Sequence, residues 1–236
     1  MMHIPVSVKS EQLHIYYIGQ EQQPVLVVDE FWPQPEQLLN FALQHGEVCA
    51  VSGGYPGLRS PAPDIFGRTV LVTLAAVIEQ VFGVTASQVK QIDSYYSMVL
   101  TPASELTPLQ TMPHFDRAQP ADLALVYYLC QPEHGGTSFY RHRRSGFEAI
   151  IPERQEDYQQ LLALDLQQYG LPKGYINGDT ALFARIASVP ARFNRLLMYR
   201  CSSLHSGDIA ADYQYNLDPC RGRFTLTAFF SCNQIT

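Results

Sequence analysis

The chain has 236 residues and a formal net charge of -6, with 46% hydrophobic and 16% charged residues. This composition excludes a disordered chain and predicts a folded protein whose length suits one domain. Nucleic acids and anionic membranes attract basic surfaces, so the negative charge argues against both as partners. A small or neutral substrate fits better, whether a small molecule, an amino acid or a peptide.

Cysteine usage and the N-terminal residues bear on the compartment. The five cysteines are scattered and include no Cys-x-x-Cys pair of the kind that binds zinc. Residues 1–17 mix charged side chains into their apolar ones, unlike a signal peptide, and no later run approaches the ~18 apolar residues of a membrane helix. We therefore expect a cytoplasmic protein with reduced cysteines and no membrane segment; an oligomer is compatible with the sequence.

The first 90 residues predict one strand and two helices. Residues 25–29 form a short apolar run, and apolar residues at helical spacing follow it as far as Leu43. Residues 49–66 are rich in glycine and proline, which predicts a long loop of the kind that is often functional. Residues 69–82 then show one apolar helical face, closed by Gly83.

The rest of the chain is dominated by short strand signals rich in Tyr, Val, Leu, Phe and Thr. One helix, at residues 153–169, interrupts them. Two helices followed by many strands predict a mostly β, α+β fold in which the helices support a β-sandwich or barrel. The expected strands are residues 92–100, 123–130, 137–141, 181–183, 196–201 and 224–230.

His114 and Asp116 form the first part of a candidate metal site. In an extended chain, residues two positions apart point to the same face, so both side chains can reach one ion. His205 follows the strand predicted at residues 196–201 and offers a third ligand. Two histidines and one carboxylate on one face of a metal are typical of non-haem iron(II) oxygenases, because three adjacent positions stay open.

A bidentate 2-oxo acid can fill two of those open positions, and its far carboxylate then needs a buried cation. Arg223 and Thr225 share one face of the strand predicted at residues 224–230, so a guanidinium and a hydroxyl point together. Arg221 is a rival for this role, since it lies two residues earlier and Gly222 permits a bulge between the two arginines.

These residues resemble a known family. The segments His114-Phe115-Asp116, Gly135-Gly136-Thr137-Ser138-Phe139-Tyr140, His205-Ser206 and Gly222-Arg223-Phe224-Thr225 occur in the order typical of the iron(II)/2-oxoglutarate-dependent dioxygenase superfamily, and the similarity is greatest to its prolyl-hydroxylase-like branch. It covers about residues 92–232. The separation of His205 and Arg223 is longer than in many members of the family.

The resemblance implies a double-stranded β-helix, the jelly-roll or cupin-like fold, in residues 91–236, with a helical insertion near residues 150–180. Residues 1–90 would supply a supporting strand and helices to this single domain. The resemblance also implies Fe(II) at His114, Asp116 and His205, with 2-oxoglutarate bound as co-substrate by Arg223. In this family a hydroxyl such as that of Thr225 and a nearby tyrosine, here Tyr96 or Tyr95, often assist.

The activity that the resemblance implies is hydroxylation of an unactivated C–H bond, with conversion of 2-oxoglutarate and O2 to succinate and CO2. A cupin-type metal-dependent isomerase or hydrolase would use the same metal ligands without needing Arg223. In a third alternative, the chain is a non-catalytic binding sandwich whose His114, Asp116 and His205 lie apart.

Several other features stay open at this stage. The basic run 141–144 is interpreted as a solvated turn or as an anion-binding patch, and His134 and His142 as surface or substrate-side residues. Residues 55–59 form either a tight turn or a cover over the mouth of the active site. The insertion at residues 153–179 is interpreted as a lid, a substrate flap or an oligomer contact.

Overall fold

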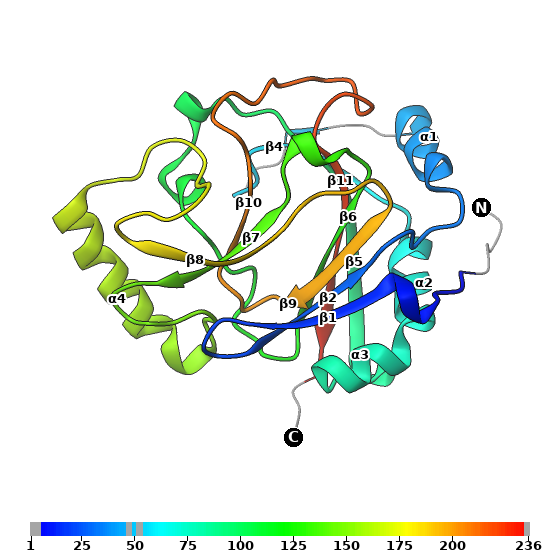
Figure 1. Cartoon of the computed structure of the whole chain (residues 1–236), viewed down its shortest axis with the longest axis horizontal. Helices are drawn as coiled ribbons and strands as arrows, with labels where there is room; N and C mark the ends of the chain where they lie inside the picture. The colour runs from blue at the N-terminus through cyan, green and yellow to red at the C-terminus, as the bar shows by residue number, and fades with distance from the viewer. Residues whose placement is uncertain (1–5, 46–48, 51–53, 234–236) are drawn as a thin grey trace.

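The computed structural model describes residues 6–45, 49–50 and 54–233, which form two antiparallel sheets and four α-helices (Figure 1). The larger sheet has eight strands in the order β1-β2-β9-β6-β11-β5-β4-β3, and the smaller has the order β10-β7-β8. The strands are β1 Leu13–Ile18, β2 Gln23–Val28, β3 Cys49–Ala50, β4 Gly57–Pro61, β5 Val89–Val99, β6 Leu123–Tyr128, β7 Thr137–His142, β8 Phe183–Val189, β9 Arg195–Arg200, β10 His205–Gly207 and β11 Phe224–Cys232.

The two faces of the larger sheet have different roles, and β11 shows this most clearly. Leu226, Ala228 and Phe230 point to the main hydrophobic core, which the N-terminal helices cover. Thr225 and Thr227 point to the other face, which lines a cavity. The alternation in the sequence therefore reports one apolar and one polar face, as predicted.

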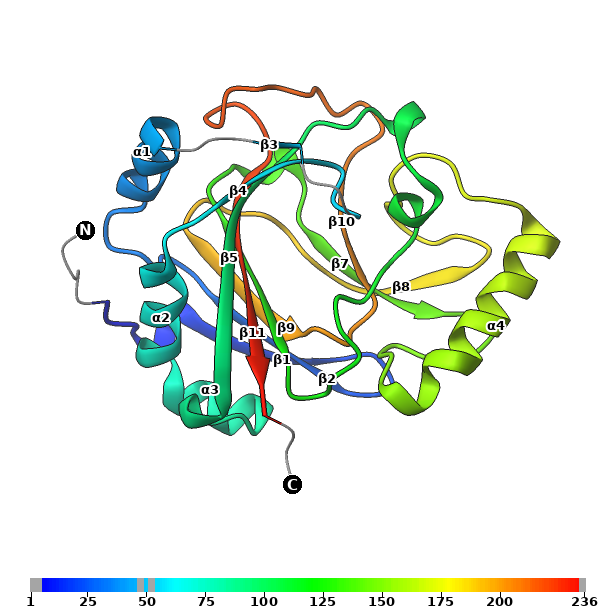
Figure 2. The same cartoon turned by 180° about the vertical axis from the view of Figure 1, so that it is seen from behind.

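Three helices cover the outer face of the larger sheet: α1 Pro35–His45, α2 Asp64–Thr73 and α3 Ala75–Phe82 (Figure 2). The single helix predicted at residues 69–82 is wrong, because α2 and α3 are bent by 72° at Leu74. Val70, Leu74 and Ile78 all remain buried through the bend, so the apolar face follows the sheet. Among the described residues no single helix could span a membrane; only the bent pair passes on length and composition.

The fourth helix, α4 Pro152–Tyr169, lies on the other side of the molecule, beside β7 and β8 (Figures 1 and 2). Its Tyr158, Leu162 and Leu166 pack with Tyr140 and Phe183 in a separate apolar cluster. The helix predicted at residues 153–169 is confirmed.

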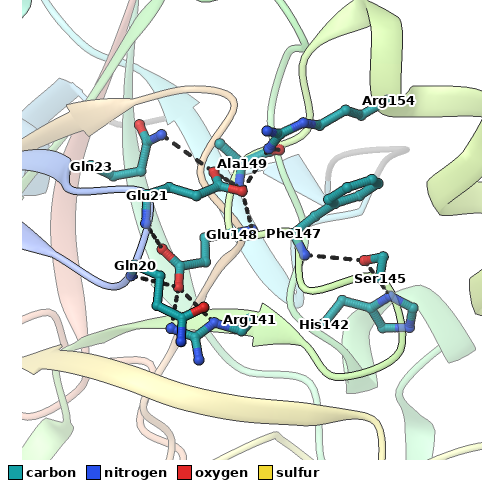
Figure 3. A network of polar contacts seen from close by, with 10 residues as sticks. All are labelled: Gln20, Glu21, Gln23, Arg141, His142, Ser145, Phe147, Glu148, Ala149 and Arg154. Atoms are coloured by element: carbon teal, nitrogen blue, oxygen red, sulfur yellow. Dashed lines mark hydrogen bonds and ion pairs between the residues drawn. The ribbon is translucent and has the colours of Figure 1, made fainter.

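The turn between β1 and β2 is tied to the segment before α4 by the buried carboxylate of Glu148 and the partly buried one of Glu21 (Figure 3). Glu148 accepts hydrogen bonds from the amides of Gln20 and Glu21, each at 2.9 Å, and from Nε of Arg141 at 2.7 Å. Glu21 in turn accepts from Nη1 of Arg154 at 2.6 Å. This network fixes the N-terminal hairpin, and β2 of that hairpin pairs with β9, the strand that leads to His205.

The mostly β, α+β prediction is confirmed. The strand predicted at residues 181–183 is wrong, since β8 begins only at Phe183. β1 was missed because exposed positions of this edge strand carry Tyr16 and Tyr17, so apolar and polar residues do not alternate in its sequence. β4 was missed inside the predicted loop at residues 49–66. The double-stranded β-helix winding and the division at residue 90 stay predictions.

Candidate metal centre

The three predicted ligands come together between the two sheets. His114 forms an isolated antiparallel bridge with His205, in which each amide donates to the other residue's carbonyl at 2.8–2.9 Å. The amide of Asp116 donates to the carbonyl of Cys201 at 2.8 Å. Backbone hydrogen bonds therefore place all three side chains before any metal binds.

The geometry of the side chains suits one ion. Nε2 of His114 lies 3.7 Å from Oδ1 of Asp116, and Nε2 of His205 lies 3.6 Å from Oδ2. One ligand atom from each residue falls in a group whose members are all within 4.8 Å of one another. Oδ2 of Asp116 is buried with no hydrogen-bond partner among the described residues, which is costly for a carboxylate without a cation. The non-catalytic alternative required these residues to lie apart, and they do not.

The surroundings of the two imidazoles suit metal binding. Nδ1 of His205 lies 2.9 Å from the carbonyl oxygen of Ser203, so it carries the proton and leaves the lone pair of Nε2 free. The exposed surface of His114 faces the cavity that it lines. Enclosure by protein, together with the neighbouring His205, lowers the pKa of His114 to about 4. A neutral imidazole is the form that binds a metal.

The ligands open onto a cavity of about 490 Å³, which is large enough for a co-substrate and a small substrate. Its walls come from both sheets, including β4 of the larger sheet, and from α4. The lining includes Tyr55, Arg59, Tyr158, Leu162, Tyr175, Tyr199, Arg223, Thr225, Thr227 and Phe229. The segment 55–59 therefore borders the cavity, as one of the two interpretations predicted, and the insertion supplies part of its wall.

Arg223 lies buried in this cavity, with 5% of its surface exposed. Its Nη2 donates to the carbonyl of Gly136 at 2.8 Å, while Nε has no partner among the described residues. No carboxylate in the described chain comes within ion-pair distance of it. A buried guanidinium without a counter-ion is strongly unfavourable, so an anionic ligand fits here.

The two glycines of the predicted Gly135-Gly136 segment are explained by close backbone approaches. Gly135 has a φ of +82°, and a Cβ there would lie 1.7 Å from the carbonyl oxygen of Asp208. A Cβ on Gly136 would lie 2.1 Å from the carbonyl oxygen of Val189. Only glycine lets the segment before β7 lie this close to its neighbours, and this places the Gly136 carbonyl at Arg223.

Of the other residues predicted to bind the co-substrate, some line the cavity and others lie outside it. Thr225 lines the cavity, but the Tyr96 side chain points to the main core on the opposite face, where its hydroxyl donates to the carbonyl of Leu38 at 3.0 Å. We therefore correct the Tyr96 assignment. Tyr95 lines a smaller adjoining cavity instead. Arg221 has a side chain that is 77% exposed and lies 3.8 Å from Asp218, outside the cavity.

The sequence analysis did not assign two tyrosines near Arg223, Tyr213 and Tyr55, to the co-substrate site. Tyr213, in the long segment after β10, accepts a hydrogen bond from the Arg223 amide at 2.6 Å. The hydroxyl of Tyr55 is buried with no partner among the described residues, and desolvation raises its pKa, so it remains a donor. Residues 55–59 had been singled out by their glycine and proline content, whereas nothing in the sequence pointed to Tyr213.

The basic run 141–144 ends in a turn where Arg143 and Arg144 are exposed, as the solvated-turn interpretation predicted, and all three of its arginines have carboxylate partners. Arg143 and Arg144 form ion pairs with Asp179 and Asp165, and Arg141 pairs with Glu148. His142, predicted as a surface or substrate-side residue, is fully buried and does not line the cavity, and its Nε2 lies 2.9 Å from Oδ2 of Asp165. This cluster attaches α4 to β7.

Comparison with models of known protein families identifies one match. Residues 9–230 match the model of a family described as "Family of unknown function (DUF6445)", and the chain belongs to that family. A search of curated proteins found no match.

Several solved structures match this chain at low sequence identity, and the two with TM-scores of 0.50 or more share its fold. HygX from Streptomyces hygroscopicus, with iron bound, has a TM-score of 0.52 and 12% identity over 98% of this chain and 89% of its own. EvdO2 from Micromonospora carbonacea var. aurantiaca has a TM-score of 0.50 and 9% identity, with 100% and 96% coverage. The epimerase SnoN, in complex with Fe3+, alpha ketoglutarate and nogalamycin RO, has a TM-score of 0.48 and 13% identity, with 88% and 78% coverage. The prolyl-hydroxylase-like branch stays a prediction.

Proposed function

We propose that this protein is an Fe(II)- and 2-oxoglutarate-dependent oxygenase that oxidises a C–H bond of a small substrate, with hydroxylation as the expected outcome. The observation that carries the proposal is the pairing of two features in one cavity: three converging metal ligands and a buried arginine without a counter-ion. HygX, which shares the fold, binds iron. A cupin-type isomerase or hydrolase has no need of Arg223.

The residues fit both groups. His114, Asp116 and His205 would hold the metal, and their chemistry favours a divalent transition ion with open positions. Iron(II) bound there supplies the coupling between oxidative decarboxylation of 2-oxoglutarate by O2 and oxidation of the substrate.

The residues of the protein bind the co-substrate, orient a metal ligand and limit access of water. The Arg223 guanidinium binds the far carboxylate of 2-oxoglutarate, and Thr225 and the Tyr55 hydroxyl lie where they can add hydrogen bonds. The carbonyl of Ser203 holds the His205 ring in one tautomer. The apolar wall around Tyr158 and Leu162 limits water near the oxidising centre.

The first test is anaerobic titration of the Fe(II)-loaded protein with 2-oxoglutarate, followed by visible absorption. We expect a weak charge-transfer band in the wild type and an apparent 2-oxoglutarate affinity reduced about tenfold or more in Arg223→Gln. Arg221→Gln is the matched control, because this exposed arginine lies two residues away. Iron binding without any band would favour the cupin-type isomerase or hydrolase.

A second test addresses the metal itself. Asp116→Ala should lose bound iron after equilibrium dialysis, measured by elemental analysis, and should form no succinate. Asp212→Ala removes an exposed carboxylate and should retain both. Normal iron content in Asp116→Ala would refute the ligand set.

A further inference from the structure

The cavity contains a second cation, Arg59 on β4, which the co-substrate does not explain. Arg59 lines the main cavity and also the smaller adjoining cavity of about 280 Å³. Asp116 and Phe229 line both cavities as well, so the Arg59 side chain borders the same space as the metal ligands.

Arg59 lies in a row of cross-strand neighbours that share one face of the sheet. It pairs in register with Ser97 on β5, which pairs with Thr225 on β11. Two strand spacings separate the Arg59 and Thr225 backbones, roughly 10 Å. Arg223 lies two residues before Thr225, and its Nη2 donates to the carbonyl of Gly136, just before β7 of the smaller sheet. Arg59 lies over the Tyr55 ring, whereas Arg223 donates to the Gly136 carbonyl, so the two guanidiniums have different protein partners.

The Arg59 guanidinium is held in place but not neutralised. Its carbon lies 4.2 Å from the centre of the Tyr55 ring, 5.7 Å from that of Tyr95 and 5.9 Å from that of Phe229. Nε donates to Oγ of Ser97 at 3.2 Å. Stacking on aromatic rings fixes the plane of the guanidinium, and its η nitrogens keep the paired donors that match a carboxylate.

The neighbouring Arg117 has carboxylate partners, whereas Arg59 has none among the described residues. Arg117 lines the same smaller cavity but lies 3.6 Å from Asp93 and 3.2 Å from Asp122. Within the described part of the chain, no carboxylate lies within 4.0 Å of an Arg59 nitrogen. A half-buried arginine facing a cavity without a protein carboxylate is suited to an anion from outside.

The opposite wall of the cavity is apolar. Met112, Phe115, Tyr158 and Leu162 belong to the cluster under α4, and all four border the cavity. A ligand that spans the cavity therefore meets a cation at one end and aromatic and aliphatic side chains at the other.

We propose that Arg59 binds a carboxylate of the substrate, and that the substrate is an organic acid with an apolar or aromatic body. This inference rests on the proposed function, since it takes Arg223 and the metal ligands as the co-substrate site. Arg59 is then a specificity-determining residue, which orients the acid so that its apolar body lies between the metal ligands and α4.

The test compares acids with their neutral amides. Isothermal titration calorimetry under anaerobic conditions, with Fe(II) and saturating 2-oxoglutarate, would measure binding of benzoate, phenylacetate, 3-phenylpropanoate and 4-phenylbutanoate and of the four matching amides. We expect at least one acid to bind about tenfold or more tightly than its amide. No acid preference at any chain length would overturn the proposal.

Variants assign the preference to a residue. Arg59→Gln should bind acid and amide equally, while its affinity for 2-oxoglutarate stays within about twofold of wild type. Arg59→Lys keeps the charge but loses the planar pair of donors, so it should retain part of the preference; it also serves if Arg59→Gln does not fold. Arg221→Gln controls for the change in net charge.

The remaining outcomes are distinguishable. An acid preference that survives in Arg59→Gln overturns the proposal, as does a loss of 2-oxoglutarate affinity as large as that in Arg223→Gln, because Arg59 would then belong to the co-substrate site. Repeating the titrations without iron and 2-oxoglutarate separates this inference from the proposed function: acid binding through Arg59 would persist there even if the charge-transfer band never appears.

Discussion

Replacing Glu148 by alanine should be strongly destabilising, because its carboxylate is a buried acceptor shared by two parts of the chain. The side chain is 0% exposed and accepts from two backbone amides and from Arg141. Alanine would leave the partly buried Arg141 and both amides unpaired. Removing one partner of a buried ion pair costs about 3–5 kcal/mol, a large share of the ~5–15 kcal/mol that stabilises a typical protein.

The assay is thermal and urea unfolding followed by circular dichroism. For a chain of this size, a loss of about 3–5 kcal/mol lowers the midpoint by roughly 6–20 °C. Glu148→Gln keeps one acceptor oxygen and most of the volume, so it should lie between alanine and wild type. Glu79→Ala, at an exposed helical position, should change little. A Glu148→Ala protein within about 1 kcal/mol of wild type would refute the reasoning.

Three further predictions follow from single contacts. Gly19→Ala should destabilise the protein, measured by urea unfolding, because Gly19 has a φ of +69° and a Cβ there would lie 2.0 Å from the Glu148 carboxylate. Tyr96→Phe should lower the free energy of unfolding by about 1 kcal/mol in the same assay, because it removes the hydrogen bond to Leu38, and should leave 2-oxoglutarate affinity unchanged. A weakened affinity would show that Tyr96 belongs to the co-substrate site after all. Burial lowers the pKa of His142 despite Asp165, so the unfolded chain takes up this proton first as the pH falls. Stability should therefore decline below about pH 6.5, and less steeply in His142→Gln; equal slopes would contradict this.

The grouping of the candidate metal ligands could be predicted because their signal is local or ordered along the chain. His114 and Asp116 needed only the two-residue repeat of an extended segment, and His205 needed a preceding strand. Arg223 followed from the alternation along β11. The structure brings these four residues to one cavity, as the pattern predicted.

Other parts of the site could not be predicted, because the contacts that define them join distant residues. Tyr213 reaches the Arg223 amide from a long segment without periodicity. Tyr96 and Tyr95 are adjacent in the sequence, and only the register of β5 against β11 decides which one faces the cavity. The arginines around His142 favoured a surface or substrate-side position, whereas its burial depends on Asp165, a residue of α4 that lies 23 positions away in the sequence.

The charge of the whole chain and the charge of its cavity favour different ligands. An excess of acidic residues argues against a polyanionic partner, yet two arginines in one cavity lack a carboxylate partner in the described chain. The chain has more acidic than basic residues, and the neighbouring Arg117 forms ion pairs with both Asp93 and Asp122. Leaving Arg59 and Arg223 unpaired is therefore consistent with anions that arrive from outside, since an enclosed guanidinium is costly without one. Two such cations, each held by different protein partners, fit two acids bound in one cavity, a co-substrate and a substrate.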